Sequence, residues 1–338
     1  MLFLPVGSLE TRIFFMLKLY FAAHFRDKGV NMTFQDHPIL IFDGACGTNL
    51  QQMAIPDQAW GGCDGCNEAL NLYGPEFIVD LHRSMLDAGA MVVETDTFGA
   101  SRIVLAEYGL QEKVREINHL AIDHARKAIG GRENRYIAGS VGPGTKLPSL
   151  GHIEVEELAD ATRQQVEALL EGGVDCLIVE TCQDLLQTKT ALITTFEVLE
   201  SANLELPVLA SVTIEQQGTM LVGSDIGAVV ATLEPFPLFS LGLNCATGPQ
   251  DMASHVRYLG QHWPQRISCI PNQGLPEVVD GETVYPLSPN DFATQMHRFC
   301  TEEGVSVVGG CCGTSPAHIK ALAEKLAGVE PRQREVSR

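Results

Sequence analysis

Residues 305–314 read VSVVGGCCGT, a short apolar run that passes directly into a glycine-rich segment with two adjacent cysteines. Short runs of this kind, rich in valine and isoleucine, are typical of strands that are buried on both faces of a parallel sheet. Similar units recur from Pro38 onward and alternate with longer amphipathic stretches. This alternation predicts βα units built around a parallel sheet.

The number of such runs decides the architecture. Eight predicted strands suggest a single-domain α/β fold, the closed (β/α)8 barrel or TIM barrel. An open doubly wound sheet is the alternative, but Gly44 and Gly47 do not form the phosphate-binding fingerprint that usually follows its first strand. The amphipathic stretches between the runs would form the outer ring of helices. The predicted strands are Ile39–Phe42, Met91–Glu94, Tyr136–Val141, Asp175–Glu180, Val208–Val212, Phe239–Asn244, Ile267–Ile270 and Val305–Val308.

Three segments make up the predicted domain organisation. Residues 1–37 form a leader that we expect to be disordered or a start-site extension, residues 38–327 form the barrel, and residues 328–338 form a charged tail. The apolar patch Ile13–Leu17 in the leader is followed by Lys18 and is too short to span a membrane. No small-residue cleavage site follows it, so a targeting signal is the less favoured alternative.

Charge and cysteine content narrow the classes of partner. The 338 residues carry a formal net charge of −19, which disfavours nucleic acid and anionic membrane surfaces because like charges repel at contact range. The ten cysteines lack the spacing of a secreted disulfide scaffold, and Cys311 and Cys312 are neighbours. We therefore expect reduced cysteines and a cytoplasmic location.

Three cysteines fall at the predicted ends of strands. Cys245 follows the sixth run, and Cys311 and Cys312 follow the eighth. Strand ends of a (β/α)8 barrel meet at one face, where such barrels have their active sites. Three soft ligands suit zinc, and a fourth position left open is typical of a catalytic rather than a structural site. Spacing alone fits ordinary buried cysteines or a structural zinc site equally well, but the strand-end position favours a functional site.

Six short motifs at these strand ends resemble the homocysteine S-methyltransferase family, and the resemblance covers Pro38 to about Ala327. A further stretch, WGGCDGCNE at residues 60–68, resembles the N-terminal homocysteine-binding module of cobalamin-dependent methionine synthase more than the betaine or S-methylmethionine enzymes. The six motifs are DGACGT at 43–48, ETDTF at 94–98, GSVGP at 139–143, ETC at 180–182, NC at 244–245 and GCCGT at 310–314.

The resemblance implies a set of site residues. Zinc would be held by Cys245, Cys311 and Cys312, with the homocysteine sulfur as fourth ligand, and the amino group of homocysteine would meet Asp43 and Glu180. The positions agree with this in part, because carboxylates that end the first and fourth strands sit at the barrel mouth and could pair with an ammonium group. Taken without the family, each could equally be a capping or solvated carboxylate.

The implied activity is methyl transfer to the thiol of homocysteine, giving methionine. In the methionine synthase branch the donor is methylcobalamin on a separate cobalamin-binding module, which a folate-binding module recharges; this chain would supply the homocysteine half. Neither other module is present in residues 1–338, which fits either a short protein with separate partners or a piece of a longer chain.

Two alternatives remain. The nearer is a standalone enzyme that uses S-methylmethionine or S-adenosylmethionine, and the more remote is a noncatalytic zinc-binding barrel. A betaine donor is disfavoured because quaternary ammonium groups are bound by aromatic cages and only 7% of the residues are aromatic.

Overall fold

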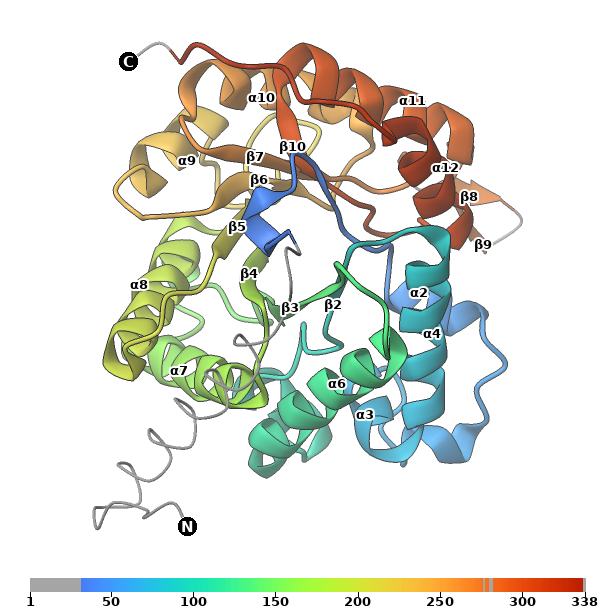
Figure 1. Ribbon diagram of the computed structural model, residues 1–338. Coiled ribbons are helices and arrows are strands. Elements are labelled where there is room, and N and C mark those ends of the chain that lie inside the picture. The colour runs from blue at the N-terminus through green and yellow to red at the C-terminus, as the bar shows by residue number, and fades with distance from the viewer. Residues whose placement is uncertain (1–31, 276, 280–281, 337–338) are drawn as a thin grey trace, which may run out of the picture.

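The strands form a closed parallel barrel, as predicted. The computed structural model describes residues 32–275, 277–279 and 282–336. Eight strands pair in the order β1-β10-β7-β6-β5-β4-β3-β2, and the ring closes where Phe42 pairs with Val92 and the Met91 N–H donates to the Ile41 carbonyl at 2.7 Å. Figure 1 looks into this ring. The strands are β1 Leu40–Ile41, β2 Val92–Glu94, β3 Tyr136–Val141, β4 Cys176–Cys182, β5 Val208–Val212, β6 Ser240–Asn244, β7 Arg266–Ile270 and β10 Val305–Val308.

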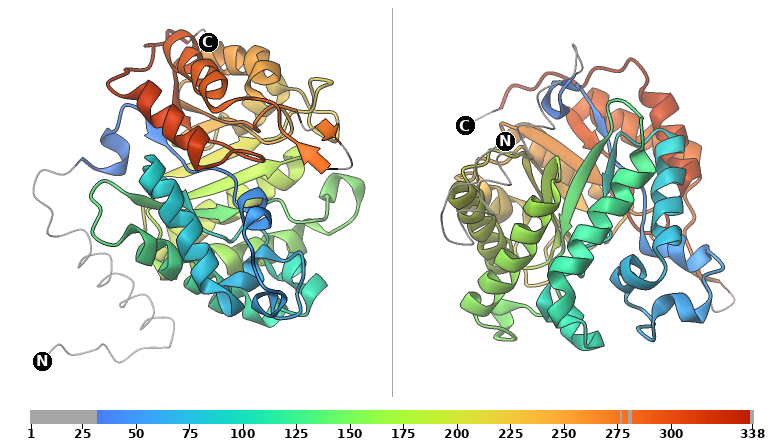
Figure 2. Two further views of the ribbon diagram at one scale, coloured as in Figure 1. Left: turned by 90° about the vertical axis from the view of Figure 1, so that its right-hand side faces the viewer. Right: turned by 60° about the horizontal axis from the view of Figure 1, so that its bottom comes forward.

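Helices surround the strands on the outside of the barrel (Figures 1 and 2). Local signals fix several helix ends. The Asp184 and Ser288 side chains each accept a free N–H group in the first turn of a helix, while Gly89 and Gly173 end two others in the left-handed conformation. The α-helices are α2 Gly47–Gln52, α3 Leu70–Tyr73, α4 Pro75–Ala88, α5 Arg102–Leu105, α6 Val114–Ile129, α7 Val155–Gly172, α8 Leu185–Ala202, α9 Ile226–Leu233, α10 Pro249–His262, α11 Pro289–Arg298 and α12 Pro316–Leu326.

Short 3-10 and π segments complete the connections. They are η1 Phe34–Asp36, η2 Asp57–Trp60, η3 Asn67–Ala69, η4 Ala106–Tyr108, η5 Gln111–Lys113, η6 Pro148–Leu150 and the π-helical η7 Phe299–Glu303. No helix among the described residues is both long and apolar enough to cross a membrane.

Two hydrophobic layers follow from the alternation of side chains along each strand. The larger fills the space between barrel and helices, and the smaller fills the barrel interior with residues such as Leu40, Val92 and Ile178. Glu94 and Glu180 come two residues after Val92 and Ile178, so they point to the same inner side, nearer the carboxyl ends of the strands. The inner layer at the mouth is therefore acidic rather than aliphatic.

A short 3-10 helix closes the opposite end of the barrel. Phe34 of η1 is buried and packs its ring against Tyr136 and Phe239 at the starts of β3 and β6. The Arg266 guanidinium donates to the carbonyls of Gln35 and His37 and holds this segment in place. Packing thus begins within the segment predicted as leader, while residues 1–31 lie outside the described residues.

The segment predicted as a charged tail contacts the barrel. The Arg332 N–H donates to the Cys300 carbonyl at 2.9 Å, and the Arg334 guanidinium donates to the carbonyl of buried Trp263 at 2.6 Å.

The structure contains one hairpin that the sequence does not predict. A two-stranded antiparallel hairpin, β8 Glu277–Val279 and β9 Glu282–Val284, interrupts the connection between β7 and α11. Each of its strands has only three residues, too few for the alternation of polar and apolar residues to stand out in the sequence.

Candidate active site

Three cysteine sulfurs meet at the barrel mouth. The Sγ atoms of Cys245, Cys311 and Cys312 all lie within 4.8 Å of one another, and those of Cys245 and Cys312 are 3.9 Å apart. Among the described residues this is the one group of three or more potential metal ligands. All three cysteines are partly exposed. The structure thus brings together the three thiols that the sequence pattern singled out.

The backbone after β6 and β10 aims these sulfurs. Cys245 and Ala246 have φ of 60° and 57°, in the left-handed region that non-glycine residues rarely adopt. After β10, a Cβ on Gly310 would lie 2.3 Å from the Thr314 Oγ1, so only glycine allows this tight turn. Gly313 has φ of 81°, and the ring of Tyr285 packs against it. Adjacent cysteines can therefore leave strand geometry and face the same point.

The three thiols shift one another's acidity. Hydrogen bonds with Cys245 and Cys311 lower the pKa of Cys312 to about 3, whereas hydrogen bonds with Cys245 and Cys312 raise the pKa of Cys311 well above its usual value. The lowered pKa of Cys312 favours its thiolate form, which is the form that binds metal.

The thiol geometry matches a tetrahedral zinc site. Zn–S bonds of about 2.3 Å at tetrahedral angles put two sulfurs about 3.8 Å apart, close to the 3.9 Å between Cys245 and Cys312. Three cysteine sulfurs are soft ligands, which bind zinc in preference to hard cations such as magnesium. The residues present therefore fit zinc with a fourth position left for another ligand.

Three carboxyl groups line the mouth beside the thiols. Asp43 follows β1, Glu94 ends β2 and Glu180 lies in β4; Asp43 and Glu180 are each only 7% exposed. The Glu94 N–H donates to both Asp43 carboxylate oxygens, at 3.3 and 3.2 Å, and the side chains of Glu94 and Glu180 are hydrogen-bonded to each other. Asp43 and Glu180 are thus linked through Glu94, to which the sequence motif gave no role.

Glu180 is held by several donors. The Ser140 hydroxyl donates to it at 2.6 Å, the Thr181 hydroxyl at 3.2 Å and the Asn244 amide at 3.2 Å. Asn244 in turn accepts from the Thr181 N–H at 2.9 Å and from the Ser211 hydroxyl at 2.6 Å, which fixes the orientation of its amide. Because Cys245 is the next residue, one polar network reaches from the carboxyl groups to the thiols.

Burial makes these carboxyl groups costly to ionise. It raises the pKa of Asp43 and of Glu94 well above their usual values, and raises that of Glu180 despite its donors. Neighbouring carboxyl groups add to the effect for Asp43 and Glu94. A bound cation would offset both the cost of burying these charges and the repulsion between them, so the site is suited to a positively charged group such as an ammonium.

Two further acidic residues are buried, Asp96 just after β2 and Glu68 in η3. Asp96 accepts from the Cys46 thiol at 3.4 Å and from the Asn71 amide at 3.1 Å, and Glu68 accepts from the Gly99 N–H at 2.6 Å. Burial, followed by the charge of Glu68, raises the pKa of Asp96 to about 8. No metal-ligand cluster includes this pair among the residues that the structure covers.

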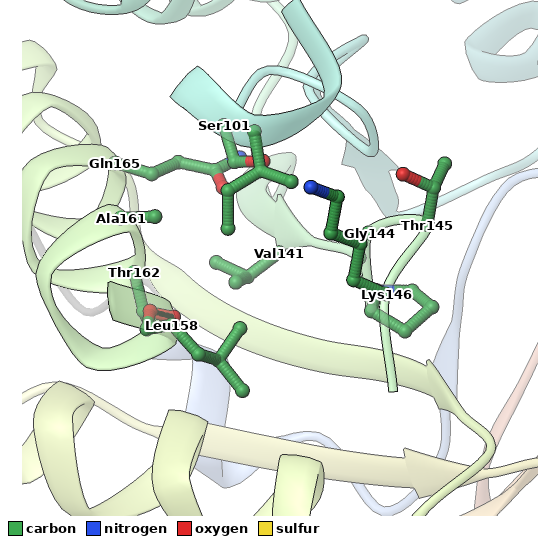
Figure 3. Close-up of a pocket in the computed structure, with 12 residues that line it drawn as sticks. Ser101, Val141, Gly144, Thr145, Lys146, Leu158, Ala161, Thr162 and Gln165 are labelled. Atoms are coloured by element: carbon green, nitrogen blue, oxygen red, sulfur yellow. Dashed lines mark hydrogen bonds between the residues drawn. The ribbon is translucent and has the colours of Figure 1, made fainter. Parts of the chain in front are cut away.

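A small hollow lies beside β3 and α7 (Figure 3). It is lined by Val141 at the end of β3 and by the segment that follows, including Lys146, by Ser101 before α5, and by Leu158 and Gln165 of α7. None of the three cysteines or three carboxyl groups lines it, so it is not part of the candidate site.

The other cysteines do not join the thiol group. The pair Cys63 and Cys66 lies in the loop between η2 and η3 and packs in a small cluster with Leu105 and Tyr108. Cys176 and Cys269 are fully buried in the two core layers and act as small apolar residues.

A barrel with three converging thiols and an acidic inner layer at its mouth defines a class of candidate thiol-metal enzymes. The sequence profile of the homocysteine S-methyltransferase family matches residues 40–326. The chain therefore belongs to the homocysteine S-methyltransferase family, whose members are methyltransferase enzymes.

Similar proteins include methionine synthases. The chain is 42% identical over 303 residues to methionine synthase of Mycobacterium tuberculosis and 41% identical over 302 residues to that of Mycobacterium leprae. These matches cover 88% and 87% of the chain but 25% of each relative, so the chain spans about a quarter of the length of these relatives.

A solved structure of similar size also matches. The homocysteine methyltransferase MmuM from Escherichia coli superposes with TM-scores of 0.68 in its oxidized form and 0.67 in its metallated form, each at 25% identity. Each match covers 86% of this chain and 96% of MmuM.

Proposed function

We propose that the chain binds homocysteine at the barrel mouth and transfers a methyl group to its sulfur, giving methionine. The observation that carries this proposal is the convergence of three thiols within 4.8 Å beside a buried acidic layer. Homocysteine has a thiol and an ammonium group, so each half of the site has a matching group on this substrate.

The chain's own residues divide the work. Cys245, Cys311 and Cys312 would hold zinc. When bound, zinc supplies a positive charge that lowers the pKa of a coordinating thiol and makes it available as a nucleophile near pH 7. Asp43 and Glu180 would bind the substrate ammonium group and fix the direction of its side chain toward the thiols. Reduced thiols are needed throughout, so we place the protein in the cytoplasm.

The identity of the methyl donor separates two branches of the family. Identity of 42% to a methionine synthase favours methylcobalamin carried by a separate cobalamin-binding module, with a folate-binding module that recharges it. A match along 96% of the Escherichia coli homocysteine methyltransferase favours the alternative of a standalone enzyme that uses S-methylmethionine or S-adenosylmethionine.

The deciding experiment is methionine formation by the zinc-loaded chain from homocysteine, with each donor offered in parallel. We expect turnover with methylcobalamin and none with S-methylmethionine or S-adenosylmethionine. Turnover only with either of the latter would assign the chain to the standalone branch. Homocysteine binding without turnover from any donor would point to a missing carrier protein. If homocysteine neither binds nor reacts, the noncatalytic zinc-binding barrel becomes the better description.

A further inference from the structure

Glu94 contacts both carboxyl groups of the proposed ammonium site. Its backbone N–H donates to the two oxygens of Asp43, and its side chain is hydrogen-bonded to that of Glu180. It ends β2, two residues after Val92, whose side chain belongs to the barrel interior. The third carboxyl group therefore lies in the same inner layer as Glu180 and reaches it across the mouth.

The pair can form its hydrogen bond only when one carboxyl group carries a proton, because an ionised carboxylate has no donor. Glu180 accepts from Ser140, Thr181 and Asn244, and these donors stabilise its charged form. Within the part of the chain that the structure describes, no donor other than its partner is found for the Glu94 carboxyl group. The proton of the pair therefore belongs on Glu94 and the negative charge on Glu180.

We propose that Glu94 is a positioning residue, a neutral acid that donates to Glu180 and holds that carboxylate, charged and fixed, toward the substrate ammonium group. Its backbone N–H orients Asp43 in the same way. This inference rests on the proposed function, because the cation is the ammonium group of homocysteine. The competing arrangement has Glu94 ionised and in direct contact with the ammonium group as a third carboxylate.

Two substitutions separate these arrangements. Glu94→Gln keeps the shape and offers an amide N–H to Glu180, so we expect the Kd and KM for homocysteine to stay within about 3-fold of wild type. Glu94→Leu removes the donor and should weaken homocysteine binding by about 10- to 100-fold, since hydrogen bonds to charged groups contribute about 1.5–3 kcal/mol. Zinc content and kcat at saturating homocysteine should be unchanged in both variants.

The probe that isolates the ammonium group is 4-mercaptobutanoate, which is homocysteine without its amino group. Calorimetric titration of the zinc-loaded variants should show that Glu94→Leu changes its Kd by less than about 3-fold. A loss of affinity for both ligands alike would indicate a general disturbance of the mouth and overturn the inference. Glu68→Gln is the matched control, because Glu68 is a buried glutamate that accepts from Gly99 instead.

The outcomes also distinguish this inference from the proposed function. A wild-type chain that binds no homocysteine overturns both. A wild-type chain that binds homocysteine, together with a Glu94→Gln variant that has lost about 10-fold or more in affinity, overturns the role of Glu94 alone. If Glu94→Leu does not fold, Glu94→Ala replaces it. The Glu94→Gln variant also tests the inference by itself, because it should lose affinity for homocysteine if Glu94 acts as an ionised carboxylate.

Discussion

The two sides of the barrel mouth are built in different ways. On the thiol side, Cys245, Cys311 and Cys312 follow their strands and lie in turns that need glycine or a left-handed backbone. On the carboxyl side, Glu94 and Glu180 lie within strands and point inward through ordinary alternation. Metal ligands have to meet at one point, which strand geometry does not provide for adjacent residues, whereas an acidic inner layer needs only the right residue in each strand.

Asn244 joins the two sides. It ends β6, donates to Glu180 and Thr181, and is followed directly by Cys245. Thr181 has φ of 55°, so a strained backbone lies on this side as well, held by the Asn244 side chain. Strain and hydrogen bonding are therefore concentrated where the two halves of the site meet.

The largest effect should come from removing one thiol. Cys312→Ala leaves two sulfurs, too few to hold zinc tightly, so we expect loss of the metal and a fall in turnover on the order of 10³-fold or more. Zinc per chain after dialysis, measured by atomic absorption, and methionine formation check this. Cys63→Ala is the matched control and should keep both. A Cys312→Ala variant with full metal and activity would remove Cys312 from the ligand set.

Removing a carboxyl group should weaken the binding of homocysteine without affecting the binding of zinc. Glu180→Ala should raise the KM for homocysteine on the order of 10²-fold, because truncating one partner of a buried charge pair costs about 2–5 kcal/mol. Zinc should stay bound, since the thiols are intact. Steady-state kinetics with metal analysis checks this, with the exposed Glu197, paired to Arg163, as the control for Glu→Ala. An unchanged KM would contradict the assigned role.

The comparison also explains what the sequence could and could not predict. All eight barrel strands were predicted within two residues at each end, because valine- and isoleucine-rich runs mark strands buried on both faces. The thiols were found because cysteine at a strand end is chemically distinctive. Glu94 lies in the motif ETDTF, but the motif assigns it no role, since both faces of a barrel strand are buried and the sequence does not tell which face a given residue is on.

The sequence does not predict how the strands are aligned with one another. The register of β2 against β3, where Glu94 pairs with Ala138, sets the height of Glu94 in the barrel and thereby its reach to Glu180. The Asn244 network likewise depends on the positive φ at Thr181, a residue type that gives no signal for it. Local sequence patterns do not encode either feature.

Removing the link between the two sides should have an intermediate effect. Asn244→Leu takes donors from Glu180 and leaves the Thr181 N–H without its acceptor, so we expect a stability loss of about 1–3 kcal/mol and a KM for homocysteine raised about 10-fold. Urea denaturation and kinetics check both. Asn118→Leu, a buried amide in α6, should lose stability without the change in KM. Equal KM effects in both variants would argue against a specific link.

The smallest effect concerns the buried acids Asp96 and Glu68. In the folded chain the pKa of Asp96 is about 8, above its value near 3.9 in an unfolded chain, so the folded state binds the extra proton. The stability that this proton contributes is complete below pH about 4 and is lost as pH rises through about 8. Asp96→Asn cannot ionise and should therefore lose less stability between about pH 5.5 and pH 8.5 than wild type does, by about 1–3 kcal/mol.

Urea midpoints at the two pH values measure this difference, and Asp80→Asn, an exposed acid paired with Arg83, should leave the wild-type slope intact. Part of the slope should survive in Asp96→Asn, because Asp43, Glu94 and Glu180 also have raised pKa values. A variant with the full wild-type slope would show that Asp96 is already ionised at low pH, stabilised by the Cys46 and Asn71 donors. The pH dependence of stability would then come from Asp43, Glu94 and Glu180 instead, which are the carboxyl groups at the mouth.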